Sequence, residues 1–561
     1  MKVRSTHAHS HATLAGILNA APRDAVALRF GNQQLSYGAL CAAVDTIAHG
    51  LAARGLGAGD VLGIWLPNTP RWLLLHLACA SLGVATLSLN PKLGVKELVS
   101  FIDRSACKAL AFDVRLAHVQ ASRNGAHADA AATLEGESLL GQVWRQHAGS
   151  LNLLIDCSDD VARVACGEQT DRAQRLPVWC DWEQLQSDRS DALTVRSECA
   201  ELPCIILSSS GTTSVPKLIV HTQRNVALHV QDVAPGFDVD ADCTTLLVLP
   251  MCGAFGYTAA LMTLAAGATL LLHDVFDPAK AVQALAGQPV SHMFGTNDMV
   301  EKMLPASLPD DWRPRALRMF GHANFVPGLD ELPAQAERFG IRMVGCFGMS
   351  EIFALFAHQR VDAPLPRRGQ SGGVPVTASV QVRARDLATG SIAAPMEAGE
   401  LEFKGSYMMR EYFGDPQATA KVFTDDGFLR SGDLGYVNGD GGFTHVSRLG
   451  DVLRIGGFLV NPAEIEEALL AICPSSACQV VAVNAEGSSR PFAFVIDHPD
   501  LAFDEDAIKN ALQQQIARYK VPIRILKVDS FPYVVGPNGS KVKRNELRGM
   551  AQAIVDKENA K

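Results

Sequence analysis

The strongest constraint on the fold is the alternation of helical and strand patterns along the first hundred residues. Tyr37–Gly55 repeats apolar side chains at helical spacing, and the apolar run Val61–Leu66 follows a glycine-rich turn. The pattern then repeats, with a helix predicted over Pro70–Leu82 and a strand over Val84–Leu89. Such alternation is typical of an α/β layered fold built on a mostly parallel sheet.

The composition excludes several classes of protein. The 561 residues are 48% hydrophobic and 19% charged, which suits a chain with a large core and not a mostly disordered one. The net charge is −9 and no run of like charges forms a basic stripe, which argues against nucleic acid or an anionic membrane as a partner. The 13 cysteines include no CxxC pair and lie mostly in apolar stretches, so we expect buried thiols and a cytoplasmic protein.

One uncharged segment, residues 243–272, is longer than the ~20 residues that span a bilayer. Pro250 and three glycines interrupt it. It reads better as a buried strand over Thr244–Leu249, a small-residue helix over Tyr257–Ala266 and a second strand over Ala268–Leu272. We therefore predict no transmembrane segment here.

The middle of the chain has a weaker pattern. Between about residues 115 and 200 only Leu151–Ile155 reads clearly as a strand, so we interpret this region as an insertion or a variable surface region. Strong periodicity resumes at Pro203, and Glu400–Lys404 alternates like a half-buried antiparallel strand.

A second unit is predicted from about residue 449. Asn461 is a helix-capping residue, Pro462 stands at the first helical position and Glu464 at the third, so a helix begins here. The elements expected after it are strands at Gln479–Val483 and Phe492–Ile496, a helix at Asp504–Arg518 and a strand at Arg524–Val528. This order is typical of a small α+β domain.

A loop rich in hydroxyl side chains follows the apolar strand Cys204–Leu207. It reads Ser208-Ser209-Ser210-Gly211-Thr212-Thr213-Ser214-Val215-Pro216-Lys217. These hydroxyls, the glycine and the lysine can surround a phosphate with O–H and N–H donors. The loop is not a Walker loop, because the second glycine and the Gly-Lys-Ser/Thr ending are absent. Taken alone, the pattern favours a polar surface turn over a phosphate site.

The loop does not stand alone. It resembles the phosphate-binding signature of the AMP-forming adenylating superfamily, which includes acyl- and aryl-CoA synthetases, luciferase-like enzymes and the adenylation domains of peptide synthetases. Further matches follow in the order of that family: Leu249-Pro250-Met251, Cys346-Phe347-Gly348-Met349-Ser350-Glu351, Ser431-Gly432-Asp433-Leu434-Gly435, Ser447-Arg448 through Gly456-Gly457, Tyr519-Lys520-Val521-Pro522 and Ser540-Lys541-Val542-Lys543-Arg544. The chain is identified as a member of this superfamily, closest in kind to an acyl-CoA synthetase.

The chemistry of such an enzyme accounts for these residue types. A carboxylate is a poor acylating agent because its leaving group would be oxide, so it is first converted into a mixed anhydride with AMP. A carboxylate oxygen then attacks the α-phosphorus of ATP while pyrophosphate leaves, which brings negative charge beside negative charge. Cations and hydrogen-bond donors must screen that charge.

The resemblance implies a nucleotide and metal site. Glu351 and the loop hydroxyl of Thr212 would help to hold Mg²⁺, Phe347 would stack on adenine in place of the usual tyrosine, and Asp433 would accept hydrogen bonds from the ribose hydroxyls. Arg448 would support the nucleotide from the domain junction. The full set of expected ATP-binding residues is Ser209, Ser210, Gly211, Thr212, Thr213, Lys217, Phe347, Gly348, Ser350, Asp433, Arg448, Gly456 and Gly457.

The catalytic residues implied are Lys541, Glu351 and Thr212. Lys541 lies beside a glycine- and proline-containing stretch, residues 536–539, that we read as flexible. In the family this lysine reaches the active site and bridges the carboxylate and the α-phosphate. Lys543 is the neighbouring alternative. With Lys541 withdrawn, Gly456 and Gly457 would line the approach of the pantetheine thiol of coenzyme A.

Three positions depart from the family pattern. Gly253 replaces the bulky histidine that usually stands beside the acyl pocket, which leaves that gate open. Gln223 replaces a histidine in the phosphate-loop helix. Gly450 stands at the domain hinge, where Asp or Lys is usual, and glycine permits the change of φ and ψ that a hinge makes.

We therefore expect an α/β protein with a large layered N-terminal domain, residues 1–446, and a smaller mobile α+β C-terminal lid, residues 449–561, joined by a hinge near 448–451. The expected activity is an ATP- and Mg²⁺-dependent carboxylic acid–CoA ligase that forms AMP and pyrophosphate. One alternative is a ligase that loads an acyl-carrier protein; another is a non-catalytic nucleotide-binding protein.

The expected acid is apolar. Ala254 stands where amino-acid-activating relatives have an aspartate, so α-amino acids should be rejected. The walls would be Cys252–Phe255 together with Phe320, Phe325 and Val326. A medium or long fatty acid is the first expectation, in keeping with fatty acid metabolism, and an aromatic or alicyclic acid the second. His322 and Asn324 have either a structural role or a role in binding a ring substituent.

Overall fold

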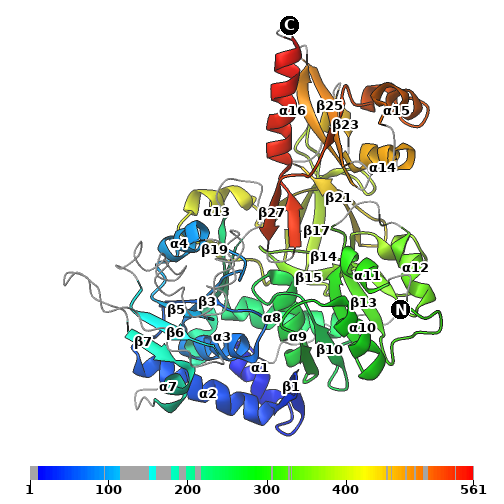
Figure 1. Ribbon diagram of the computed structural model, residues 1–561. Coiled ribbons are helices and arrows are strands. Elements are labelled where there is room, and N and C mark those ends of the chain that lie inside the picture. Colours follow the sequence, from blue (N-terminus) through cyan, green and yellow to red (C-terminus); the bar gives the residue numbers. More distant parts are fainter. Residues whose placement is uncertain are drawn as a thin grey trace, which may run out of the picture.

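The structure is a computed structural model (Figure 1). It describes residues 11–93, 95–113, 151–158, 178–188, 197–208, 216–304, 308–325, 329, 331–449, 453–455, 458–460, 462–473, 477–485, 488–496, 503–536 and 539–559.

Two large sheets dominate the fold. The larger has thirteen strands, in the spatial order β17 (Gln381–Arg385), β18 (Gly399–Lys404), β20 (Leu429–Val437), β21 (Phe443–Arg448), β16 (Gly372–Pro375), β15 (Phe353–His358), β14 (Met343–Met349), β13 (Met319–Ala323), β12 (His292–Thr296), β10 (Thr244–Leu247), β11 (Thr269–Leu272), β1 (Val26–Phe30) and β2 (Gln33–Ser36). Pairing is parallel from β1 through β11, β10, β12 and β13 to β14, and antiparallel from β14 to β17. This confirms the predicted α/β class and the antiparallel strand at Glu400–Lys404.

The second sheet has eight strands. Their order is β19 (Glu411–Tyr412), β9 (Leu218–Thr222), β8 (Pro203–Ser208), β4 (Ala85–Ser88), β3 (Val61–Trp65), β5 (Ala109–Phe112), β6 (Leu153–Asp156) and β7 (Val178–Asp181). β6 and β7 extend the parallel part of this sheet. The region 115–200 is therefore not only an insertion, because its described strands complete a sheet edge.

Helices lie between the two sheets and outside them (Figure 1). One core cluster joins residues of both sheets to α1 (Leu14–Ala20), α2 (Tyr37–Ala53), α3 (Pro70–Leu82), α8 (Gln223–Gly236) and α9 (Ala254–Ala265). The outer faces pack against α4 (Val95–Arg104), α10 (Pro278–Gly287), α11 (Asn297–Met303) and α12 (Leu332–Arg338). Two further short helices are α7 (Trp182–Ser187) and α13 (Pro416–Val422).

The uncharged segment folds as an internal strand-helix-strand unit, as predicted. Its helix α9 begins at Ala254, three residues before the predicted start, and its residues are buried as far as Leu264. Within the part of the chain that the structure describes, no helix has the length and apolar character needed to cross a membrane.

The remaining strands form small sheets. They are β22 (Leu453–Ile455) with β23 (Phe458–Val460), β24 (Ala477–Ala485) with β25 (Ser488–Ile496) and β26 (Ile525–Val528), and the hairpin of β27 (Tyr533–Gly536) and β28 (Gly539–Val542). Their helices are α14 (Pro462–Ile472), α15 (Glu505–Leu512) and α16 (Arg544–Asn559). α15 ends six residues before the predicted Arg518, because the chain tightens into i→i+3 hydrogen bonds after Leu512.

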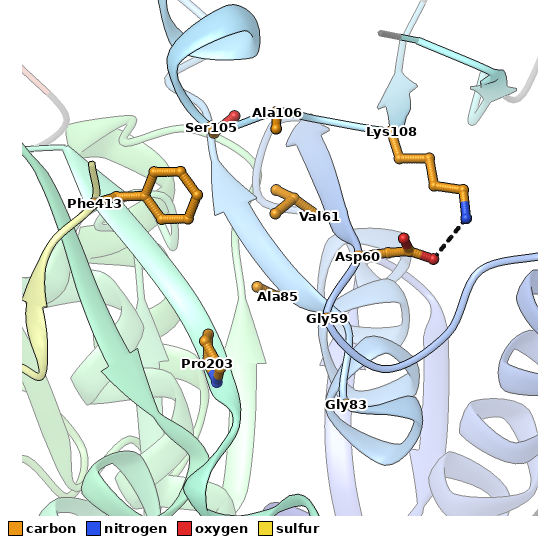
Figure 2. A pocket seen from close by; sticks show the side chains of 10 residues that line it. All are labelled: Gly59, Asp60, Val61, Gly83, Ala85, Ser105, Ala106, Lys108, Pro203 and Phe413. Atoms are coloured by element: carbon orange, nitrogen blue, oxygen red, sulfur yellow. Dashed lines mark hydrogen bonds and ion pairs between the residues drawn. The ribbon is translucent and has the colours of Figure 1, made fainter.

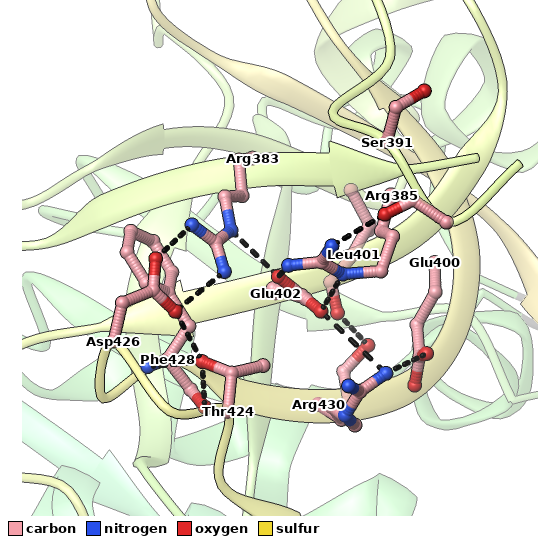
Figure 3. A network of polar contacts seen from close by, with 12 residues as sticks. Arg383, Arg385, Ser391, Glu400, Leu401, Glu402, Thr424, Asp426, Phe428 and Arg430 are labelled. Atoms are coloured by element: carbon pink, nitrogen blue, oxygen red, sulfur yellow. Dashed lines mark hydrogen bonds and ion pairs between the residues drawn. The ribbon is translucent and has the colours of Figure 1, made fainter.

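A network of charged side chains crosses the antiparallel end of the large sheet (Figure 3). Glu402 is fully buried and accepts hydrogen bonds at 2.6 Å from the Nε atoms of both Arg383 and Arg385. Arg383 also binds Asp426 through two nitrogens, at 2.5 and 2.9 Å. Burial opposes ionisation of Glu402, but the hydrogen bonds from Arg385 and Arg383 hold its pKa below the usual value. The buried charge is thus fully paired.

Candidate active site

Glu351 lies in the turn between β14 and β15, and this turn is held from two directions. The carbonyl oxygen of Ser350 accepts a hydrogen bond of 2.7 Å from Nε2 of His221 on β9. The backbone N–H of Met409 donates to the carbonyl oxygen of Glu351, also at 2.7 Å. Because a carbonyl only accepts, His221 must carry its proton on Nε2. Burial lowers the pKa of His221 to about 4, which keeps the ring neutral.

The structure brings Lys217 and Glu351 together around a residue that the sequence did not mark, Tyr412. The hydroxyl of Tyr412 donates to Oε1 of Glu351 at 2.9 Å. The ammonium nitrogen of Lys217 lies 4.3 Å from the centre of the Tyr412 ring. A predicted phosphate-binding cation and a predicted metal-binding carboxylate therefore share one aromatic neighbour.

Asp433 and Arg448 face each other across β20 and β21, where the antiparallel register pairs their Cα atoms. Nε of Arg448 lies 3.0 Å from Oδ1 of Asp433, and Nε2 of His445 lies 3.6 Å from the same oxygen. Asp433 follows Gly432, whose φ of +70° is a left-handed conformation that favours glycine. The N–H of Gly432 donates to Oε1 of Glu400 at 3.2 Å, which ties this part of β20 to the charged network of Figure 3.

Phe347 belongs to an aromatic cluster and is 8% exposed. Its ring is 5.3 Å from that of His445 and 5.1 Å from that of Phe443, centre to centre. The next residue, Gly348, is exposed, and a Cβ there would lie 2.3 Å from Cα of Ala354, so only glycine fits. The cluster brings the predicted adenine residue beside the Asp433 site, while the stacking itself stays a prediction.

Several predicted residues lie outside the described residues. These are Ser209, Ser210, Gly211, Thr212 and Thr213 of the phosphate loop, the hinge residue Gly450, and Gly456 and Gly457 between β22 and β23.

Lys541 lies on a strand, and residues 537–538 of the stretch expected to be flexible lie outside the described residues. It stands on β28, with its backbone opposite Val534 of β27. The hairpin extends from the base of α16 on the side that faces the large sheets (Figure 1). A pair of strands therefore carries the predicted catalytic lysine.

Gly253, the residue predicted to stand beside the acyl pocket, lies at the start of α9. Gly253 is the N-cap residue of this helix, and the preceding loop is held by Asn68, which donates to the carbonyl of Leu249 and accepts from the N–H of Met251.

Gln223, the second departure from the family, is buried and donates to the carbonyl of Ala80, so its role is to fix the start of α8.

The predicted acid-pocket wall is only partly assembled. Phe320 is fully buried in the core that faces α10 to α12, so this ring points away from α9 and the prediction for it is wrong. Phe325 is 37% exposed, and Val326 lies outside the described residues. Nε2 of His322 and Nδ2 of Asn324 both donate to the carbonyl oxygen of Gly369, at 3.2 and 3.0 Å, which favours the structural role for this pair.

A cavity of about 460 Å³ lies elsewhere, where the strands of the eight-stranded sheet begin (Figure 2). Val61, Ala85 and Pro203 are the first residues of β3, β4 and β8, and Lys108 pairs with Asp60 at 2.8 Å on its rim. Ligands of open α/β sheets bind beyond the carboxyl ends of the strands. This cavity is therefore not the active site.

Comparison with known proteins gives a consistent result. Residues 18–413 match the family of AMP-binding enzymes. The feruloyl-CoA synthase of an Amycolatopsis species is 30% identical over 532 residues, which cover 93% of this chain and 95% of that protein. The 4-coumarate–CoA ligase 2 of Nicotiana tabacum is 25% identical over 90% of this chain and 88% of that enzyme.

The fold agrees as well. The crystal structure of ATP-bound MatB from Rhodopseudomonas palustris superposes with a TM-score of 0.80 at 23% identity and covers 97% of this chain and 99% of that one. The family match spans most of the chain, and the relatives are similar along nearly their whole length. The chain therefore belongs to the AMP-binding enzyme family, in the class of AMP-forming acid–CoA ligases.

Proposed function

We propose that this ligase makes the CoA thioester of an aromatic carboxylic acid. The observation that carries this choice is the feruloyl-CoA synthase, which is similar over 93% of the chain. A salicylyl-CoA synthase and plant 4-coumarate–CoA ligases are further relatives. This order reverses the expectation from sequence, in which a fatty acid came first and an aromatic acid second.

The entrance to α9 supports an apolar acid. Gly253 and Ala254 place small side chains at the start of the helix, and residues 243–272 contain no charged side chain. A substrate ammonium group would therefore meet no carboxylate from this segment, and a buried unpaired charge is strongly disfavoured. An α-amino acid should be a poor substrate.

We assign adenylation to residues from the large N-terminal part of the chain, before residue 446, and to one residue from the C-terminal part, after residue 449. Lys217 and the loop hydroxyls would hold the β- and γ-phosphates, and Asp433 would accept hydrogen bonds from the ribose. Lys541 would place its ammonium group between the carboxylate and the α-phosphate, where negative charge develops. Lys217, Lys541 and the loop hydroxyls lower the repulsion between two anions that must come into contact, while Asp433 holds the ribose.

The donor chemistry at Glu351 fits magnesium. Carboxylate oxygens are preferred Mg²⁺ ligands. Oε1 of Glu351 accepts from Tyr412, while Oε2 makes no hydrogen bond or ion pair with any residue the structure describes. Glu351 and the hydroxyl of Thr212 would hold the ion, which neutralises phosphate charge when bound.

Thioester formation requires a second arrangement of the chain. We propose a hinge near 448–451 that divides a domain of residues 1–446 from a lid of residues 449–561. Rotation about Gly450 would withdraw Lys541 and bring Gly456 and Gly457 to the path of the CoA thiol. The thiol sulfur then attacks the acyl carbon, and AMP leaves.

The test is a panel of acids assayed for acid-dependent release of pyrophosphate from ATP and, by mass spectrometry, for the CoA thioester. Ferulate, 4-coumarate, salicylate and benzoate are compared with octanoate, palmitate and phenylalanine. We expect at least one aromatic acid to exceed both fatty acids in kcat/KM by tenfold or more. A fatty acid as the best substrate would overturn the aromatic assignment, and product formation only with an acyl-carrier protein would overturn CoA as acceptor.

A further inference from the structure

Tyr412 touches two residues that the proposed function places on the phosphates and the metal. Its hydroxyl lies 2.9 Å from Oε1 of Glu351, and its ring centre lies 4.3 Å from Nζ of Lys217. These three residues come from separate parts of the chain, and Tyr412 contacts both of the others. Its two contacts use different parts of the side chain, the hydroxyl and the ring face.

The backbone around Tyr412 is fixed by strand pairing. Tyr412 lies on β19, which pairs antiparallel with β9. The flanking residues also bind that strand, because the N–H of Arg410 donates to Val220 O at 2.8 Å and the N–H of Phe413 donates to Leu218 O at 2.7 Å. The side chain of Tyr412 is almost fully buried. The phenol is therefore placed by a sheet edge and not by a flexible loop.

The residues just before Tyr412 join the same site. The N–H of Met409 donates to the carbonyl oxygen of Glu351, and Nδ2 of Asn225 on α8 donates to the carbonyl oxygen of Met408 at 2.5 Å. The segment 408–413 thus connects β9, α8 and the Glu351 turn. Lys217 directly precedes Leu218, the first residue of β9, so this segment lies at the end of β9 that carries Lys217.

We propose that Tyr412 is a positioning residue for adenylation, which holds one carboxylate oxygen of Glu351 through its hydroxyl and the ammonium group of Lys217 through its ring. The proposal rests on the roles given above to Glu351 and Lys217. The hydroxyl leaves the second oxygen of Glu351 for the metal. The ring holds the lysine cation by a cation–π contact, which does not neutralise it, so the cation keeps its charge for the phosphates.

The hydrogen-bond geometry suits this role, because a carboxylate oxygen only accepts and the Tyr412 hydroxyl is the donor to Oε1 of Glu351. Carboxylates that bind metals are themselves commonly hydrogen-bonded. Loss of such a partner costs about 10–100-fold in metal affinity or activity.

The test uses Tyr412→Phe, which removes only the hydroxyl, with Tyr407→Phe as a matched control. Tyr407 lies five residues earlier and is fully buried, and its hydroxyl has no hydrogen-bond partner among the described residues. The dissociation constant of ATP is measured by calorimetry over a series of Mg²⁺ concentrations, without acid or CoA.

We expect Tyr412→Phe to raise the Mg²⁺ concentration that gives half-maximal ATP binding about tenfold. Its melting temperature should stay near that of the parent. The control Tyr407→Phe should change neither the Mg²⁺ dependence nor ATP binding.

Two further variants separate this proposal from the proposed function. Tyr412→Leu also removes the ring, so it should weaken ATP binding even at saturating Mg²⁺, where Tyr412→Phe should not. Glu351→Gln should shift the Mg²⁺ dependence by itself, and adding Tyr412→Phe to it should produce little further shift. A shift in Glu351→Gln but none in Tyr412→Phe would overturn the role of Tyr412 alone. No shift in either variant would overturn the metal role of Glu351, and this proposal with it.

Discussion

The imidazole ring of His221 stacks on the phenyl ring of Phe353, with ring centres 3.7 Å apart and planes 25° from parallel. Phe353 is fully buried and has a φ of +65°, a conformation that costs a residue with a side chain about 1–2 kcal/mol. It follows the Glu351 turn directly. The stack and the hydrogen bond from His221 to Ser350 O thus act on the same few residues of backbone.

The strain at Phe353 should reverse the usual order of two substitutions. Both Phe353→Ala and Phe353→Gly lose the packing of a buried ring, about 3–5 kcal/mol. Glycine also relieves the positive φ, so Phe353→Gly should unfold at a higher temperature than Phe353→Ala. Phe356, buried on the same strand without a positive φ, provides the control, and there the alanine variant should be the more stable. The same order at both positions would contradict strain at Phe353.

Acid should destabilise the fold through buried neutral histidines. Burial lowers the pKa of His76 and His229 to about 3, and that of His221, His292 and His322 to about 4. In the unfolded chain these groups titrate near ~6.5. Below that pH only the unfolded state takes up the protons, so their contribution to stability is complete above pH ~6.5 and is lost as the pH falls toward ~4.

The expected loss is up to about 1.4 kcal/mol per pH unit for each histidine. Urea denaturation at pH 7, 6 and 5 measures it as a falling midpoint. An unchanged midpoint between pH 7 and pH 5 would show that these rings are protonated in the folded protein or accessible to water.

Removal of the Asp433 carboxylate should weaken nucleotide binding without unfolding the protein. Asp433→Asn loses hydrogen bonds in which one partner is charged, so we expect about a 10–100-fold rise in the KM for ATP. The side chain of Arg448 is 52% exposed and can be solvated when its partner is lost, so the melting temperature should change little. Asp362→Asn, which removes an exposed ion pair with Arg360, is the control and should leave the KM for ATP unaltered. An unchanged KM in Asp433→Asn would rule out the ribose contact.

Loss of the Lys541 ammonium group should affect the two half-reactions unequally. Lys541→Ala should slow acid-dependent pyrophosphate release about 10²–10³-fold, since a positioned charge is removed where negative charge develops. Thioester formation from supplied acyl-adenylate and CoA should stay near the parent rate. Lys543→Ala, at a residue paired with Glu546, is the matched control. Equal slowing of both half-reactions, or a larger effect of Lys543→Ala, would contradict the assignment of Lys541.

Elements with local start and stop signals were predictable from sequence. The helix predicted over Pro70–Leu82 has the same bounds in the structure, because proline fits its first turn and Gly83 adopts the left-handed conformation that ends it. The antiparallel strand near Glu400 was equally predictable, because alternating apolar and polar residues are typical of a half-buried strand.

Features that depend on distant contacts were not predictable. Side chains alternate between the two faces of a strand, so the sequence of β13 indicates that Phe320 and His322 lie on the same face. It does not indicate which helices cover that face. Tyr412 lies 61 residues from Glu351, and no local pattern connects them. The pairing of β27 with β28 was not predictable, because the glycines and the proline of residues 536–539 are typical of flexible chain when the partner of each strand is unknown.

Arg448 is the last residue of β21 and pairs with Asp433 on the neighbouring strand. A rotation that starts after Leu449 would leave this pair in place. The adenosine end of the acyl-adenylate would then stay bound while the lid rotates, withdraws Lys541 and admits the CoA thiol at the acyl carbon. Water hydrolyses a mixed anhydride. The yield of thioester per ATP would therefore depend on how fast the lid rotates, because the intermediate is never released and rebound.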